Sequence, residues 1–192
     1  MLEKFSRNAA VWLINIGLLV ETDIDLYSYA IKNLFLIINP TIIFTAYCIA
    51  THNITIGLIE VFSFLLIRKY CGGYHCQSST ACLIFSAIIL IGIAWLSSLI
   101  KPSLHMFSVL VIADIELIIK GPIISVNHSV SDFEKIYYHK CLIGILSVLN
   151  IIIIITAAYR FYHITSCISV VIIFCFILHL ACMTRKNRKL YY

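Results

Sequence analysis

Four side chains that can serve as nucleophiles, bases or metal ligands lie close together in the sequence: Cys71, His75, Cys76 and Cys82. They belong to residues 68–82, a polar interruption in an otherwise apolar first half of the chain. A thiol with its ordinary pKa of about 8.5 is only a few per cent ionised at neutral pH, so a nucleophilic cysteine needs a cation or a proton acceptor beside it. His75 can accept that proton, and this stretch therefore predicts cysteine chemistry.

Spacing alone does not select one thiol. Cys76 adjoins His75, and adjacent residues point away from each other on a helix. Cys71 would share a helical face with His75, but the glycine pair 72–73 argues against a regular helix there. Cys82 would lie about 10.5 Å further along a helix axis, so it can meet His75 only if the chain bends between them. Residues 77–80 are polar enough to form that bend.

A new helix is expected after the bend. Ser79 or Thr80 could cap it, which would place Cys82 near a helix N-terminus, where the helix dipole favours a thiolate. A metal site is the chemical alternative, since the three thiols and His75 could supply four ligands. The stretch lacks the paired C-x-x-C spacing of structural zinc sites. A third interpretation is a purely structural turn with cysteines near a membrane surface.

Composition places these residues in a membrane protein. Of the 192 residues, 61% are apolar and 12% are charged, against about 25% charged residues in soluble domains. At about 20 apolar residues per crossing, the length allows roughly six crossings. The net charge of +5 comes from residues scattered at the ends of apolar runs, so no nucleic-acid binding is expected. We predict an all-α polytopic membrane protein with one integral membrane domain, residues 1–192.

The predicted domain has three parts. Residues 1–32 show apolar side chains at three- and four-residue spacing, which indicates amphipathic interfacial helices, the second leading into the first crossing. A six-helix membrane region, 33–183, and a basic tail, 184–192, follow. The predicted crossings are residues 33–51, 54–67, 83–100, 104–119, 141–159 and 164–183. The second of these is short for a crossing unless it extends to Tyr70.

Basic residues predict the orientation of the crossings. With six crossings both termini lie on one side, and that side holds 12 of the 14 basic residues. The other side holds only Lys101 and Arg160. Because basic residues collect in cytoplasmic segments, we expect both termini and the loop 68–82 to be cytoplasmic. The larger set is Lys4, Arg7, Lys32, Arg68, Lys69, Lys120, Lys135, Lys140, Arg185, Lys186, Arg188 and Lys189.

Acidic residues within the apolar runs also need an explanation, because an acid at the bilayer centre costs about 2.5–3.5 kcal/mol on insertion scales. Glu60, Asp114 and Glu116 are expected to pair with polar groups on neighbouring helices, and a functional role is the alternative. Cysteines within the apolar runs are expected to act as small hydrophobic residues. These are Cys48, Cys167, Cys175 and Cys182.

One motif resembles a known family. The pattern Arg68-x3-Gly72-Gly73-x-His75-x6-Cys82, between the second and third crossings of a chain of this length, resembles the accessory gene regulator B (AgrB) family. Gly121-Pro122, after the fourth crossing, is similar to a proline-containing position of that family. The resemblance implies that His75 and Cys82 are catalytic, with Arg68, Gly72 and Gly73 as supporting residues.

By the same resemblance, the protein is a cysteine endopeptidase of the cell membrane that acts in quorum sensing. It would remove the C-terminal part of an AgrD-like propeptide and cyclise the remainder to a thiolactone or lactone through an acyl-enzyme thioester. A homodimer in the lipid bilayer is implied, and no cofactor or metal. The alternatives are a non-catalytic transporter or assembly protein and a membrane metal-binding protein.

Overall fold

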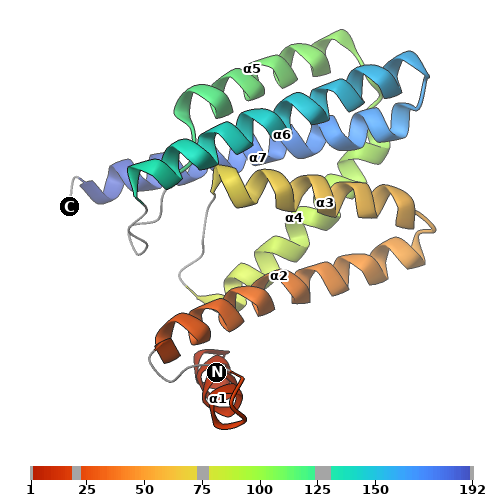
Figure 1. Cartoon of the computed structure of the whole chain (residues 1–192). Coiled ribbons are helices and arrows are strands. Elements are labelled where there is room, and N and C mark those ends of the chain that lie inside the picture. Colours follow the sequence, from red (N-terminus) through yellow and green to blue (C-terminus); the bar gives the residue numbers. More distant parts are fainter. Residues whose placement is uncertain (1, 19–22, 73–77, 124–130, 191–192) are drawn as a thin grey trace.

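The protein is described from a computed structural model that covers residues 2–18, 23–72, 78–123 and 131–190. Every regular element in these ranges is an α-helix, which confirms the predicted fold class (Figure 1). The helices are α1 (Leu2–Asn15), α2 (Ile24–Ala50), α3 (Ile54–Cys71), α4 (Ser79–Leu99), α5 (Leu104–Lys120), α6 (Asp132–Ala158) and α7 (Tyr162–Leu190).

Two helices differ in extent from the predicted runs. Helix α2 continues unbroken from Ile24, so residues 24–32 form its first turns and not a separate interfacial helix. Helix α3 continues to Cys71, which places Arg68 and Lys69 on its last turn. The extension of the second run to Tyr70 is thereby confirmed. The apolar runs themselves are shorter than these helices because polar residues at a helix end interrupt hydrophobicity without interrupting the backbone hydrogen bonds.

Four helices among the described residues are long and apolar enough to cross a membrane, namely α2, α4, α6 and α7. Helix α5 has 17 residues, and α3 carries Glu60, Arg68 and Lys69 within 18 residues. By length and composition, α3 and α5 are therefore weaker candidates for membrane crossings than the other four helices. The predicted number of about six crossings is a rough one. The apolar outer surface fits the same environment, since Ile42, Ile112 and Ile154 are each more than half exposed.

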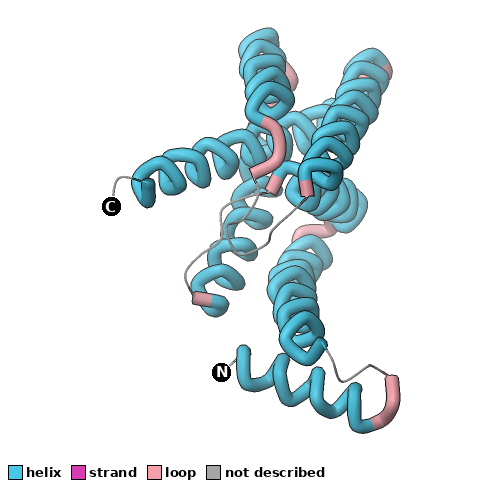
Figure 2. Tube along the Cα trace, turned by 60° about the vertical axis from the view of Figure 1, so that its left-hand side comes forward, coloured by secondary structure: helices cyan, strands magenta, loops and turns pink. Residues whose placement is uncertain are grey.

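Helix α7 occupies the centre of the bundle, in contact with α3, α4, α5 and α6 (Figures 1 and 2). Residues 165–172 are all buried, as expected for a helix surrounded on every side. Its small polar side chains let neighbouring backbones approach closely. The Thr165 hydroxyl donates to Thr156 Oγ1 at 2.9 Å, and the Ser166 hydroxyl donates to the Ile100 carbonyl at 2.8 Å.

The acids within the apolar helices have three different environments. Asp114 of α5 accepts a hydrogen bond from Asn150 Nδ2 of α6 at 3.0 Å, which confirms the expected pairing. Glu116 forms an ion pair with Lys120 of its own helix, and not with a neighbouring one. For Glu60 the expectation is wrong within the described residues, because the side chain is 0% exposed and neither carboxylate oxygen has a hydrogen-bond partner there.

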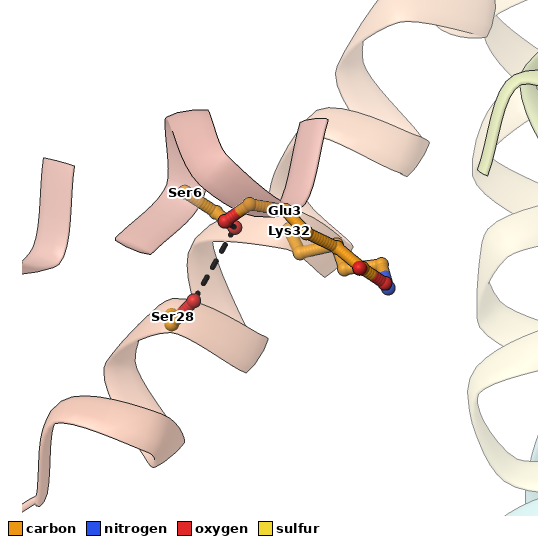
Figure 3. Close-up of polar contacts among 4 residues, drawn as sticks. All are labelled: Glu3, Ser6, Ser28 and Lys32. Carbon is orange, nitrogen blue, oxygen red and sulfur yellow. Dashed lines mark hydrogen bonds and ion pairs between the residues drawn. The ribbon is translucent and has the colours of Figure 1, made fainter. Parts of the chain in front are cut away.

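Helix α1 lies across the first turns of α2 (Figures 1 and 2). Glu3 accepts a hydrogen bond from Lys32 Nζ at 2.6 Å, and the hydroxyl oxygens of Ser6 and Ser28 lie 3.3 Å apart (Figure 3). The Lys32 ammonium lowers the pKa of Glu3 through this hydrogen bond and its charge. These contacts fix α1 against the end of α2 that also carries Tyr29 and Asn33.

Candidate active site

Cys82 lies in the first turn of α4. The side chain of Ser78 caps this helix by accepting a hydrogen bond from the Ala81 N–H at 3.1 Å, and the Cys82 N–H donates to the Ser78 carbonyl at 3.0 Å. The predicted caps, Ser79 and Thr80, were therefore one or two residues too late. The predicted position of the thiol near a helix N-terminus is confirmed, and the Cys82 side chain is almost fully buried.

Cys82 borders a cleft of about 380 Å³ between three helices, which we call the α2–α4 cleft. Helix α2 forms one wall, the second half of α3 another and the first half of α4 the third. The lining residues are Tyr29, Asn33, Leu36, Ile37, Pro40, Thr41, Val61, Phe64, Leu65, Arg68, Lys69, Cys82, Ser86 and Leu90.

Most of this lining is apolar, and its two cations come from the last turn of α3. The Arg68 guanidinium lies 5.7 Å from the centre of the Phe64 ring, and Lys69 Nζ lies 5.2 Å from the centre of the Tyr70 ring. Both cations thus rest on aromatic faces, which attract them electrostatically. Arg68 and Cys82, two of the predicted site residues, come together in the cleft.

Pro40 shapes the wall formed by α2. It lies inside the helix and has no N–H, so the carbonyl of Leu36 loses its usual helical donor. Both residues line the cleft. The helix continues beyond the proline, and the Thr41 hydroxyl donates a hydrogen bond to the Ile37 carbonyl at 2.7 Å. The proline therefore leaves a backbone acceptor beside a largely apolar cavity.

The two described thiols of the polar stretch have different surroundings. Cys71 is 1% exposed, belongs to the hydrophobic core and lies near Cys175 and Cys182 of α7. Cys82 lines the α2–α4 cleft with Arg68, and Cys71 is not among the lining residues. The fold thus separates two thiols that sequence spacing did not distinguish.

Gly72 ends α3 in a backbone conformation that favours glycine, with φ +75°. A Cβ at this position would lie 2.5 Å from the carbonyl oxygen of Ile123. The neighbouring Ile123 N–H donates to the Cys71 carbonyl at 3.0 Å, which holds the two backbone segments together. Gly72 is therefore required both by its φ angle and by this close approach.

Comparison with known proteins places this chain in a family. A model of the family described as Accessory gene regulator B matches residues 6–182. The chain belongs to this family. The match spans the α2–α4 cleft and the whole polar stretch, and it identifies the chain as a membrane protein of the agr quorum-sensing system. Searches among curated proteins and among solved structures found no significant match.

Two histidines of this AgrB-family chain that were not predicted as site residues bind the last turn of α5 and the glycine that follows it. His179 Nε2 lies 3.0 Å from the Gly121 carbonyl, and His139 Nε2 lies 2.8 Å from the Ile118 carbonyl. A carbonyl only accepts, so each Nε2 carries a proton. His179 is buried within the apolar run of α7, and that isolated polar residue was the signal available in the sequence.

The remaining predicted residues, Gly73 and His75, lie outside the described residues, as does Cys76. The pairing of His75 with Cys82 therefore stays a prediction. Among the residues that the structure describes, no group of three histidine, cysteine or acidic side chains is arranged to hold a metal ion. That search does not include two of the four ligands in the alternative metal site.

Proposed function

We propose that this AgrB-family protein is a cysteine endopeptidase that cleaves an AgrD-like propeptide and cyclises its N-terminal product. The observation that carries the proposal is the position of Cys82, in the first turn of α4 and on the wall of the apolar cleft that also contains Arg68. A nucleophile at a helix start beside such a cavity can meet a peptide carbonyl that is shielded from water.

His75 is the proposed base and acid. It is three residues from Gly72 and three from Ser78, which is at most about 11 Å of chain to either end. Cys82 would transfer its proton to His75 as sulfur attacks the scissile carbonyl, and His75 would return that proton to the departing amine. The products of this step are a Cys82 thioester and a free C-terminal fragment.

Ring closure follows by exchange. An internal thiol of the bound substrate attacks the Cys82 thioester, forms the thiolactone and restores the enzyme thiol, with one proton passing from the substrate thiol to Cys82. Thioester and thiolactone are similar in free energy, whereas attack by water would give a linear acid. Apolar side chains such as Leu36, Phe64 and Leu90 line the cleft and would keep water from the acyl-enzyme.

Backbone groups near Cys82 supply candidate donors for the tetrahedral intermediate. The first N–H groups of a helix have no acceptor within the helix. In α4 the Ala81 N–H is capped by Ser78, while those of Ser79 and Thr80 precede it. The Gly72 N–H already donates to the Arg68 carbonyl. We therefore assign oxyanion stabilisation to Ser79 and Thr80 and not to Gly72.

The positive charges near the cleft bear on the substrate and on the orientation of the protein in the membrane. Arg68 and Lys69 bring two cations to the cleft, which suits a substrate segment that carries carboxylates. We further propose that this end of the bundle is cytoplasmic, because 12 of the 14 basic residues fall on that side of the six predicted crossings. The propeptide would then reach the cleft from the compartment in which it is made.

Co-expression with short candidate propeptides tests the proposal. Cys82→Ala and His75→Ala are each expected to abolish release of the C-terminal fragment, measured by mass spectrometry, while the protein remains in the membrane. Cys71→Ala is the matched control, because it removes a neighbouring thiol that lies in the core. Normal processing by Cys82→Ala would refute the proposal.

A further inference from the structure

Helix α3 also carries an acidic residue, Glu60, for which the proposed reaction has no role. Glu60 is the seventh residue of α3 and is 0% exposed. Both carboxylate oxygens lack a hydrogen-bond partner among the described residues. An unpaired buried carboxylate is strongly unfavourable in a low-dielectric environment, so a positive charge or a proton must neutralise it.

Glu60 forms part of the wall of a separate cavity of about 360 Å³, which we call the Glu60 pocket. Four helix ends and one interhelix turn surround it: the end of α2, the turn that follows it, the start of α3, the end of α4 and the start of α7. Its polar lining residues include Thr51, Asn53, Glu60, Ser97, Ser98 and His163. None of these residues lines the α2–α4 cleft.

The three serine and threonine hydroxyl groups in this pocket have already used their hydrogens. Thr51 donates to the Tyr47 carbonyl at 3.0 Å, Ser97 to the Ala94 carbonyl at 3.0 Å and Ser98 to the Trp95 carbonyl at 2.7 Å. Since a carbonyl cannot donate, each hydroxyl oxygen offers only lone pairs to an occupant.

The amide of Asn53 adds a further acceptor. Its Nδ2 donates one of its two hydrogens to the Thr51 carbonyl at 2.9 Å, and Oδ1 remains an acceptor. Tyr47 and His163 can each donate or accept. The pocket therefore combines one carboxylate with several neutral oxygen acceptors, a set that matches a cation and offers few donors to an anion.

From this donor and acceptor inventory we propose that the Glu60 pocket binds a small monovalent cation, either an alkali-metal ion or a primary ammonium group, with Glu60 as the counter-charge. One carboxylate balances one positive charge. A calcium-type site generally gathers several acidic ligands, and no cluster of three acidic, histidine or cysteine side chains occurs among the described residues.

A bound cation would join four parts of the bundle. Tyr47 comes from α2, Glu60 from α3, Ser97 from α4 and His163 from α7. A ligand that binds only the folded state raises its stability by mass action. Occupancy should therefore be visible as a saturable, cation-specific rise in thermal stability, independent of any propeptide.

The test uses full-length protein in detergent micelles, with intrinsic fluorescence recorded during heating. Choline chloride is replaced stepwise by sodium, potassium or methylammonium chloride at constant ionic strength and constant pH. We expect at least one of these cations to raise the unfolding temperature saturably, by roughly 5 °C at about one hundred times its dissociation constant. Comparison of methylammonium with the two metal ions distinguishes the two sources of positive charge.

Three variants complete the test. Glu60→Gln should lose the cation response and be at least as stable as the unaltered protein in choline, because the unpaired carboxylate is gone. Ser97→Ala should raise the half-saturating cation concentration by about threefold to tenfold. Asp114→Asn is the control, since this acid already pairs with Asn150, and it should keep the full response.

The proposal is overturned if none of the three cations gives a saturable shift, or if Glu60→Gln responds like the unaltered protein. The proposal would also be overturned if lowering the pH raised the unfolding temperature equally in all four chloride salts. A proton, and not a bound cation, would then neutralise Glu60. Loss of propeptide cleavage through Cys82→Ala leaves this outcome unaffected, so the two proposals fail separately.

Discussion

The two halves of α3 border cavities of opposite character. Arg68, near the end of the helix, lines the α2–α4 cleft, which is largely apolar and contains Cys82. Glu60, about 12 Å earlier along the helix axis, lines a pocket of hydroxyl and amide oxygens. The first cavity suits a peptide with apolar side chains and a carboxylate, and the second suits a small cation. One helix can therefore serve two ligands because its charged residues lie at different positions along its axis.

The largest effect is expected when the charge of Arg68 is removed from the α2–α4 cleft. Arg68→Gln should lower the rate of propeptide cleavage by about tenfold to a hundredfold, the range expected for losing a hydrogen bond to a charged group. Arg68→Lys should be less severe because it keeps the charge. Kinetics with purified protein would measure the effect.

The matched control for that loss of charge is Arg160→Gln. Arg160 lies in the turn between α6 and α7 and does not line the cleft, so this variant should cleave normally. Equal loss of cleavage in both arginine variants would show that overall basic charge matters and that the cleft does not.

The junction between α3 and the segment after α5 offers a test of how the site is supported. Gly72→Ala should destabilise the fold by about 1–3 kcal/mol, because alanine disfavours positive φ and its Cβ would meet the Ile123 carbonyl at 2.5 Å. Thermal unfolding of the purified variant measures this change. Gly144→Ala is the control, since a Cβ there meets nothing within 4 Å; equal stability of the two variants would contradict the assigned contact.

Asp114 sharpens the contrast with Glu60, because it is a paired acid in the same bundle. Asn150→Ala removes its donor and should reduce stability by about 1–3 kcal/mol. Ser147→Ala, one turn earlier on α6, removes only a hydroxyl bonded to its own helix and should change little. If Asn150→Ala proves neutral in thermal unfolding, an unpaired acid is tolerated here, and the argument from Glu60 weakens.

The smallest effect is expected at the contact between α1 and α2. Lys32→Ala removes the partner that lowers the pKa of Glu3. A lowered carboxyl pKa stabilises the folded state above the ordinary value of about 4.3 and loses that contribution as pH falls through the lowered pKa. Docking of α1 should therefore weaken on acidification in the unaltered protein and respond less to acid in Lys32→Ala. Limited proteolysis between α1 and α2 measures how firmly α1 is docked. An identical acid response in the unaltered protein and in Lys32→Ala would contradict the assignment.

Sequence reasoning reached the helices and the residues of the cleft by different routes. Apolar runs predicted all six long helices, because burial in lipid requires continuous apolar surface. They did not show that residues 24–32 belong to α2, and they left the extension of α3 to Tyr70 as an option that the structure confirms. Composition and spacing narrowed the chemistry to a few thiols, and the family motif selected Cys82. Only the fold places Cys71 in the core and Cys82 in the cleft.

The Glu60 pocket was beyond sequence reasoning for a physical reason. Its polar side chains come from four helices and one turn, and from positions that are 116 residues apart at the extremes, Tyr47 and His163. Each is unremarkable in its own segment. Glu60 was expected to pair with a polar group on a neighbouring helix. That expectation failed because the nearby hydroxyls of Ser97 and Ser98 donate to backbone carbonyls of their own helix.

Mass spectrometry of the enzyme during turnover tests the central claim most directly. With a propeptide whose ring-forming cysteine is replaced by alanine, the acyl-enzyme cannot cyclise and should accumulate. We predict an adduct of the N-terminal propeptide fragment on the proteolytic peptide that contains Cys82, released by hydroxylamine as expected of a thioester and absent from Cys82→Ala. The account would be contradicted if Cys82→Ala still cleaved the propeptide without forming an adduct. An adduct on Cys71 in the unaltered protein would also contradict it.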